Sequence, residues 1–489
     1  MATASQIQLI SPSRKISFVV AGPLLIFGVV AVSLGWISMT LILKREGNFE
    51  DDCSQKDLDS DEGCQSQQQA LSLIFAIGIN FMMLGEFVGG NSADRFGPKV
   101  TSVVGIIHSI LGFIIFGAAP KSDFPMLVIG LAFISFAGPF VMQSTLNLAM
   151  AFPFPPKVIT LFGNFFSSGT LIFFIFNVFS ELGGVEKSTL CLSYAVICCG
   201  YAAVAFFIYP RKKLLAQQYS PPEQNDEKEL EDVSGREQVE NGRESETVTA
   251  AVDSKDVNSQ LAALENQKTA NADDVDCVAR EESGSLEDDV KNKKVVLPMK
   301  TIIKTPLFFW GYLVYGSINN SKMIFLVSIF NTIAETNGDD GTLQFVAGLI
   351  IPMSFVFTKF MTYVDSRFGV VKGMCFNLVG HVIMWATIMI PHHQVQYITI
   401  ILYTLCGAWI YTHLFTFAFR INQENMGRIH ALGQLLTVAI SFVCQIVFNV
   451  LTFNVFKGNL QLLGLVMMLV TACTFIAPYK ISKLGLNLQ

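Results

Sequence analysis

Apolar segments of membrane-spanning length recur twelve times along this chain of 489 residues. A helix needs about 20 apolar residues to cross the hydrocarbon core of a bilayer, and lipid tolerates only helices and closed barrels as spanning structures. The sequence therefore predicts an all-α membrane protein with twelve transmembrane helices in two pseudo-symmetric six-helix bundles. The expected spans are residues 16–43, 68–90, 100–118, 125–150, 158–180, 188–209, 305–330, 343–364, 371–390, 396–419, 428–452 and 460–478.

A long polar segment divides these spans into two sets of six. Residues 221–290 hold 21 acidic and 6 basic side chains, so the net charge of −6 for the whole chain conceals a basic remainder. Such a segment has too little apolar surface to fold, and we expect it to be disordered. The predicted parts are a cytoplasmic N-terminus (1–15), an N-terminal bundle (16–209), an acidic cytoplasmic linker (210–304), a C-terminal bundle (305–478) and a cytoplasmic C-terminus (479–489).

The lysine and arginine residues outside this linker predict the orientation of the chain. They concentrate in the turns that share a side with both termini, which is the pattern of cytoplasmic loops. Because they are spread over short turns, they do not indicate a nucleic-acid partner. On the opposite side, Cys53 and Cys64 share the first outer loop. An oxidising space would favour a disulfide between them, and two free thiols are the alternative.

Two short polar motifs follow the second and eighth expected spans. Residues 90–99 read GNSADRFGPK, and we expect a turn there, with Asp94 and Arg95 at the membrane surface. A weaker echo lies at residues 365–372. A glycine, then Asp-Arg, then a glycine and a basic residue resembles the loop signature of the major facilitator superfamily. This resemblance implies the fold of that superfamily, in which two bundles rock around a central site.

The same resemblance implies a gate at the cytoplasmic face. In that superfamily the loop aspartate closes this face against the eleventh span, which here begins near Met426-Gly427-Arg428. A helix N-terminus favours an anion, and Arg428 adds a charge partner for Asp94. By pseudo-symmetry Asp365 would face the start of the fifth span near residues 155–157. An ordinary solvated turn is the alternative for both loops. The expected gating residues are Asp94, Arg95, Asp365, Arg367 and Arg428.

Polar residues inside the spans are the candidates for a solute site. They are costly in lipid and usually face a cavity or another helix. Collectively they favour a water-filled cavity for a polar, uncharged or zwitterionic solute, although small polar residues also join helices to one another. The substrate-binding candidates are Gly163, Asn164, Ser167, Ser168, Gln143, Asn147, Tyr315, Asn319, Asn320, Trp409 and Tyr411.

The placement of ionisable residues bears on energy coupling. Glu86 lies near the cytoplasmic end of the second span, where we expect it to pair across a gate or an interface. A proton-driven carrier usually places acidic groups deep in its bundles, and none lies near the middle of the expected spans. The sequence therefore favours facilitated diffusion or exchange, while titration of Lys322 or His413 would allow proton coupling.

The end of the first span carries a second resemblance. Residues 35–47 read GWISMTLILKREG, with Cys53 soon after. This pattern is similar to the sodium-independent large neutral amino acid transporters of the superfamily and to related apicomplexan amino acid carriers. The resemblance implies uniport of amino acids, large neutral ones above all, across the plasma membrane by alternating access. We expect a monomer with no enzymatic activity, cofactor or metal, whose partners are an amino acid and the lipid bilayer.

Three other hypotheses stay open from the sequence. A carrier of a sugar, nitrate or cationic amino acid is the first, although an anion carrier would normally place arginines within its spans. A nutrient sensor, with its signal carried by the acidic linker, is the second. The third is a polytopic glycosyltransferase that uses acids of the first outer loop such as Asp51 and Asp52. The other outer loops leave that enzyme little room for a catalytic face.

Overall fold

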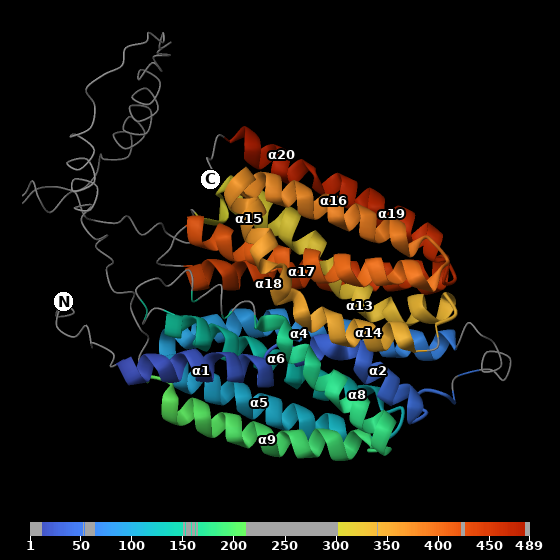
Figure 1. Ribbon diagram of the computed structural model, residues 1–489, viewed down its shortest axis with the longest axis horizontal. Coiled ribbons are helices and arrows are strands. Elements are labelled where there is room, and N and C mark those ends of the chain that lie inside the picture. Colours follow the sequence, from blue (N-terminus) through green and yellow to red (C-terminus); the bar gives the residue numbers. More distant parts are fainter. Residues whose placement is uncertain are drawn as a thin grey trace, which may run out of the picture. The chain divides into compact units, whose positions relative to one another are not determined.

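Helices make up the regular structure of the chain. The computed structural model describes residues 12–51, 53, 64–149, 152, 158, 162, 165–211, 302–339, 341–421 and 426–484. Within these ranges every element is an α-, 3₁₀- or π-helix, as Figure 1 shows along the chain. The acidic linker expected at 210–304 lies almost wholly outside the described residues, so its predicted disorder stays a prediction.

The first half of the chain forms the N-terminal bundle, coloured blue to green in Figure 1. Its first span is bent by 47° between α1 and η1, and Ala31 at the bend has a left-handed φ of 58°. Gly169 lets the fifth span approach this bend, because a Cβ there would lie 1.7 Å from the Val30 carbonyl oxygen. The elements are α1 (Pro12–Val29), η1 (Val32–Gly35), α2 (Trp36–Arg45), α4 (Gln65–Phe96), α5 (Pro98–Ala118), α6 (Phe124–Leu148), η3 (Phe166–Thr170), α8 (Leu171–Gly183) and α9 (Lys187–Ile208).

The second half forms the C-terminal bundle, coloured yellow to red in Figure 1. Its eighth span is bent by 41° before α15. The seventh span opens and the eleventh span closes with a π-helix, a widened turn often found at functional positions. The elements are η5 (Phe308–Ser317), α13 (Ile318–Thr336), α14 (Thr342–Ile350), η6 (Ile351–Phe357), α15 (Thr358–Phe368), α16 (Val370–Ile388), α17 (His393–Ile421), α18 (Met426–Asn449), η7 (Val450–Val455), α19 (Leu460–Thr474) and α20 (Ile476–Lys483).

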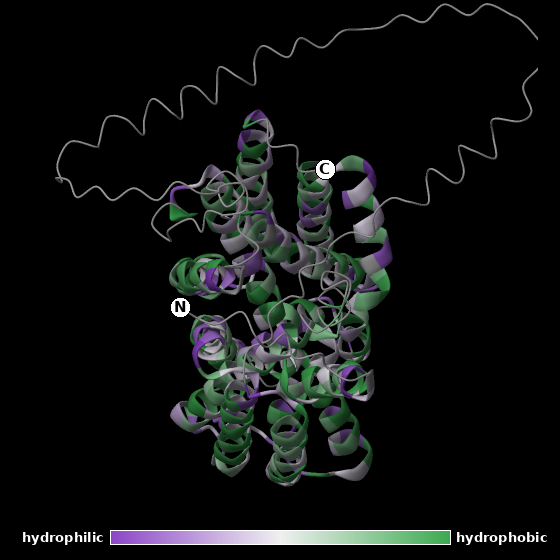
Figure 2. Ribbon diagram, turned by 90° about the vertical axis from the view of Figure 1, so that its left-hand side faces the viewer, coloured by the Kyte–Doolittle hydropathy of each residue, from purple (hydrophilic) through white to green (hydrophobic). Residues whose placement is uncertain are grey.

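The helices have the length and surface of membrane spans. Ten described helices are long and apolar enough to cross a membrane, and the number rises to twelve if each bent pair is one span. Large apolar side chains such as Val196 and Phe207 are 71% and 77% exposed, and hydrophobic residues dominate the helices in Figure 2. Exposed apolar surface of this extent suits contact with lipid. The predicted all-α membrane fold is confirmed.

Helical structure continues through the two motifs that we expected to form turns. α4 ends at Phe96 and α5 begins at Pro98, so Gly97, with φ 83°, is the whole connection. Gly369, with φ 86°, links α15 to α16 in the same way. Glycine adopts such left-handed backbone at little cost and reverses the chain within one residue. The expectation of a longer turn over residues 90–99 was therefore wrong, and Asp94 lies on the last turn of a helix.

The two bundles meet along the antiparallel helices α4 and α18. At one end, Ser72 donates a hydrogen bond of 2.8 Å to Asn449; at the other, Asp94 lies 3.5 Å from Arg428. We call these the Lys44 end and the Asp94 end, because Lys44 lies at the former. The Asp94 end is on the left in Figure 1, where α1 begins and α20 ends.

Candidate functional site

The interface between the bundles carries an ion pair at the Asp94 end. Asp94 Oδ2 on α4 lies 3.5 Å from Arg428 Nε in the first turn of α18. This is the contact that the loop motif predicts. The Arg428 side chain is 56% exposed, so water screens the pair and its contribution is modest. Arg95, the neighbour of Asp94, is exposed.

Asp94→Ala is expected to lower the transport rate by up to about fivefold and to leave the half-saturation concentration nearly unchanged. An exposed ion pair contributes about 0.2–1 kcal/mol, and its loss shifts the balance between closed and open states rather than solute contacts. Counterflow by the reconstituted protein measures both quantities. Asn91→Ala, on the exposed side of the same helix end, is the control. An unchanged rate in a well-folded Asp94→Ala protein would reduce the motif to a topology marker.

A second, buried contact lies deeper at the same end. Glu86 Oε2 on α4 is 2.9 Å from His430 Nε2 on α18, and the two side chains are 9% and 1% exposed. His430 also stacks on Phe415, with ring centroids 4.4 Å apart. The sequence predicted that Glu86 pairs across a gate or an interface, but it did not identify the partner, because a histidine on an apolar helix has many possible neighbours.

Asp365 makes its described contacts within its own bundle. Trp409 Nε1 donates to its carboxylate at 3.1 Å, and His413 Nε2 lies 3.3 Å from Oδ1. His413 Nδ1 contacts the Tyr315 hydroxyl at 2.8 Å, and Asn377 donates to that hydroxyl at 2.9 Å. The expected partner segment at the start of the fifth span, residues 155–157, lies outside the described residues. The nearby Arg367 is exposed.

At the Lys44 end the bundles are joined through Glu335, at the end of α13. Lys44 and Gln68, both from the first bundle, donate to its two carboxylate oxygens. One turn earlier, Asn331 donates to Thr40. The sequence motifs did not single out these residues; the only available signal was a pair of opposite charges at the outer ends of the first and seventh spans. Contacts therefore tie the bundles together at both ends.

Between these ends, buried polar atoms lack hydrogen-bond partners in the described structure. Gln434 on α18 is 1% exposed, and neither its amide nitrogen nor its amide oxygen has a partner. Asn80 Oδ1 on α4 and Ser441 Oγ on α18 are also buried without a hydrogen-bond partner among the described residues. Residues 430, 434 and 441 share one face of α18 by helical spacing. On this face His430 meets Glu86 of α4, and Thr437 bonds to Ser317 of η5. Unpaired buried amides are costly unless another molecule satisfies them.

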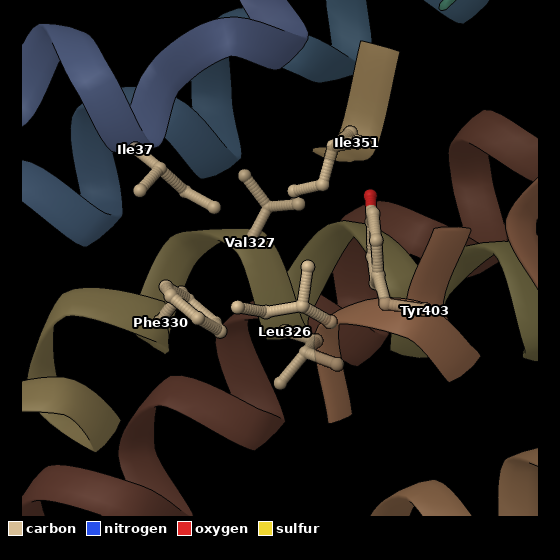
Figure 3. A pocket seen from close by; sticks show the side chains of 7 residues that line it. Ile37, Leu326, Val327, Phe330, Ile351 and Tyr403 are labelled. Carbon is tan, nitrogen blue, oxygen red and sulfur yellow. The ribbon is translucent and has the colours of Figure 1, made fainter. Parts of the chain in front are cut away.

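An apolar pocket lies beside the interface. Figure 3 shows Ile37 from the first bundle facing Val327, Leu326 and Phe330, with the Tyr403 ring and its hydroxyl nearby. It is a small void between apolar side chains and not a solute-sized cavity. The lining residues are Ile37, Leu326, Val327, Phe330, Ile351, Ile400 and Tyr403.

Some substrate-binding candidates lie at the interface. Asn320 Nδ2 lies 3.7 Å from the sulfur of Met83 on α4, and the Tyr411 ring is 5.0 Å from the Phe166 ring. Gln143 and Asn147 are buried on α6.

Other candidates are placed differently. The Ser168 hydroxyl donates to the Phe165 carbonyl, and Ser167 is half-buried. Asn319 donates to the Tyr315 carbonyl. Tyr315 and Trp409 belong to the Asp365 network in the second bundle. Gly163 and Asn164 lie outside the described residues.

Two further features concern bound groups and covalent links. In the part of the chain that the structure describes, no cluster of three or more His, Cys, Asp or Glu side chains is placed to hold a metal ion. A disulfide joins Cys53 to Cys64 at the Lys44 end, with a Cα–Cα distance of 5.7 Å. The disulfide ties the loop that follows α2 to the start of α4.

Comparison with known proteins identifies the family. The sequence pattern of the Major Facilitator Superfamily matches residues 17–444. The chain belongs to the major facilitator superfamily. Its structure is similar to the xylose transporter XylE of E. coli in an inward-open conformation, with a TM-score of 0.57, 11% identity and coverage of 95% of each chain. A D-xylose–proton symporter structure also has a TM-score of 0.57, with 12% identity and coverage of 96% and 97%. At such identities the likeness concerns the fold alone.

Curated relatives differ in how much of the chain they match. Equilibrative nucleobase transporter 1 of Bos taurus is 22% identical over 514 residues, covering 96% of both chains. Protein FMP42 of Saccharomyces cerevisiae is 27% identical over 150 residues, 30% of each. The human large neutral amino acids transporter small subunit 3 is 37% identical over 83 residues, 15% of each. The chain is therefore a multi-pass solute transporter and not an enzyme, while the expected kinship with amino acid carriers is matched over a short segment.

Proposed function

We propose that the chain is an equilibrative carrier of small, neutral, planar heterocycles of the nucleobase class, working by alternating access. The observation that carries this proposal is Gln434 on α18, whose buried amide donor and acceptor have no partner among the described residues. An amide presents a donor and an acceptor side by side, which is the pattern that glutamine and asparagine use to hold an adenine edge.

The charge distribution at the interface supports an uncharged solute. Among the described residues, the pairs of opposite charge between the bundles lie toward the two ends, at Asp94–Arg428 and Lys44–Glu335, with Glu86–His430 buried deeper at the Asp94 end. Buried Lys322, in the seventh span, donates to Thr471 on α19 within the second bundle. A zwitterion would bring two charges that need buried partners, whereas a neutral heterocycle needs only hydrogen bonds and apolar contact.

The nucleobase relative supports the same class, because its match extends over 96% of both chains. Transport by facilitated diffusion fits a carrier of this kind. We further propose cytoplasmic termini, following the charge pattern of the turns, together with a plasma-membrane location and a monomeric state.

Large neutral amino acids are the second candidate substrate. The 83-residue match to the human amino acid transporter, at 37% identity, favours them, as does the motif at residues 35–47. The amino acid's carboxylate and ammonium groups would then need polar backbone groups such as those near the bend of the first span at Ala31.

Counterflow in proteoliposomes distinguishes the two candidates. Vesicles preloaded with unlabelled adenine, leucine or phenylalanine receive the same labelled compound outside, with and without sodium or a pH gradient. The proposal predicts adenine counterflow that needs neither gradient. Counterflow of leucine and phenylalanine but not adenine would replace it with the amino acid function. Counterflow of none of the three would contradict both.

A further inference from the structure

We propose that Glu86 and His430 form a proton-binding site that holds the two bundles together at the Asp94 end. Glu86 belongs to α4 of the first bundle and His430 to α18 of the second, with 2.9 Å between Oε2 and Nε2. Both side chains are almost fully buried. Alternating access separates the bundles at this end, so any proton held by the pair is bound in one state and free in the other.

The hydrogen bonding of His430 Nδ1, the other ring nitrogen, indicates that the Glu86–His430 contact needs an added proton. The Tyr312 hydroxyl donates to the Leu414 carbonyl at 2.6 Å and lies 3.3 Å from His430 Nδ1. Since the hydroxyl hydrogen is committed to the carbonyl, any hydrogen bond between the hydroxyl and Nδ1 must be donated by Nδ1, and we assign the hydrogen to that nitrogen. A neutral imidazole has one ring hydrogen, so Nε2 would be left without one.

A bare Nε2 cannot face a carboxylate at 2.9 Å without repulsion. The contact lacks the geometry of a straight hydrogen bond, yet an oxyanion at this distance is repelled by a neutral ring and attracted by an imidazolium. One added proton removes the conflict, either on Nε2 as an imidazolium or on Glu86 as a neutral acid. The stacked Phe415 ring favours a cation at the same place.

The described groups that face the pair do not supply a competing charge. Tyr312 from η5 and Tyr411 from α17 face Glu86, and both are phenols. Phenols stay uncharged near neutral pH. On α18 itself Arg428 is the nearest charge, and it lies 3.5 Å from Asp94. The proton therefore resides on Glu86 or His430.

His413 provides the contrast within the same protein. Its Nδ1 accepts from the Tyr315 hydroxyl, whose oxygen accepts from Asn377. A single hydrogen on Nε2 then faces Asp365. A neutral ring satisfies every contact, and all partners belong to the second bundle, so neither proton binding nor the movement between bundles changes this site.

The position of the Glu86–His430 pair determines the consequence. When the Asp94 end opens, α4 and α18 separate and the proton leaves to the solution on that side; when the end closes, a proton returns from the same side. Acid on that side therefore favours the closed state, and no proton crosses the membrane. The site makes gating sensitive to pH without making the carrier a symporter, whatever solute is carried.

The test is the distance between the bundles as a function of pH. Full-length protein in nanodiscs carries spin labels on introduced keto amino acids at the exposed positions Asn91 of α4 and Lys480 of α20. In the wild type, the ratio of open to closed Asp94 end should rise with pH, with a limit of about tenfold per pH unit for one linked proton.

Three variants locate the response. In Glu86→Gln the new amide can donate a hydrogen bond to a neutral His430, and in His430→Gln the new amide can donate one to Glu86. Both hydrogen bonds form without an added proton. The ratio of open to closed Asp94 end should therefore not change with pH in either variant. His413→Gln should keep the wild-type response. A wild-type ratio that is independent of pH, or an unchanged response in His430→Gln, would overturn the proposal. Solute-driven proton flux into vesicles that contain a pH-indicator dye would overturn the claim that the proton is released and taken up on one side of the membrane.

Discussion

Gln434→Leu is expected to raise the half-saturation concentration for transport about tenfold or more without lowering the stability of the protein. A bidentate amide contact to a heterocycle contributes about 1–3 kcal/mol, which corresponds to roughly fivefold to over a hundredfold in affinity. Because neither amide atom of Gln434 has a partner among the described residues, leucine removes no described hydrogen bond and adds apolar contact. Counterflow kinetics and thermal unfolding of the same preparations measure the two effects.

Gln445→Leu is the matched control on the same helix. Gln445 is also 1% exposed, but its amide nitrogen donates to the Ser321 carbonyl at 2.8 Å. Its loss should cost about 0.5–1.5 kcal/mol of stability and leave the half-saturation concentration unchanged. If Gln434→Leu destabilises the protein while transport affinity stays at the wild-type value, Gln434 is a packing residue and the proposed solute site is wrong.

Glu335→Ala is expected to shift the protein strongly toward the state that is open at the Lys44 end. The substitution removes both carboxylate contacts that Lys44 and Gln68 make across the bundles. Hydrogen bonds to charged groups contribute about 1.5–3 kcal/mol each. The side chains of Lys44 and Glu335 are 19% and 21% exposed, so we discount the sum for screening to about 2 kcal/mol, or roughly thirtyfold.

Spin labels at the exposed positions Leu182 and Val455 report this shift as a longer distance population at the Lys44 end. Glu181→Ala is the control, since Glu181 is an acid at the same end whose partner, Arg45, belongs to the same bundle. It should leave the distances unchanged. Equal distance populations in Glu335→Ala and the wild type would show that this contact does not hold the closed end together.

The membrane fold was predictable because it depends on a property that each segment has by itself. A run of about 20 apolar residues must be helical in lipid whatever lies next to it. The polar segment between the sixth and seventh spans then divided the spans into two sets. The superfamily motif at residues 90–99 carried the prediction further, to the contact between Asp94 and the start of α18 that the structure has.

Asp365 illustrates where the motif stops being informative. Asp94 lies three residues before Gly97, and Asp365 lies four residues before Gly369. One residue turns a helical side chain by about 100°. Asp94 therefore faces α18 of the other bundle, whereas Asp365 turns toward α17 of its own and takes Trp409 and His413 as partners. The displaced register is visible in the sequence, but which helix lies in the new direction is not.

The sequence by itself determined that this chain is helical, crosses a membrane in two bundles and carries a gate motif, because these follow from local hydrophobicity and spacing. Only the tertiary structure decided which distant residues meet. Glu86 and His430 are 344 positions apart by their numbering, and Lys44 and Glu335 are 291 apart. Among the glutamine and asparagine residues of α18, Gln434 is distinguished by an amide whose nitrogen and oxygen both lack a partner within the described residues. Whether a side chain finds a partner depends on how whole helices pack, and a local sequence pattern does not predict that packing.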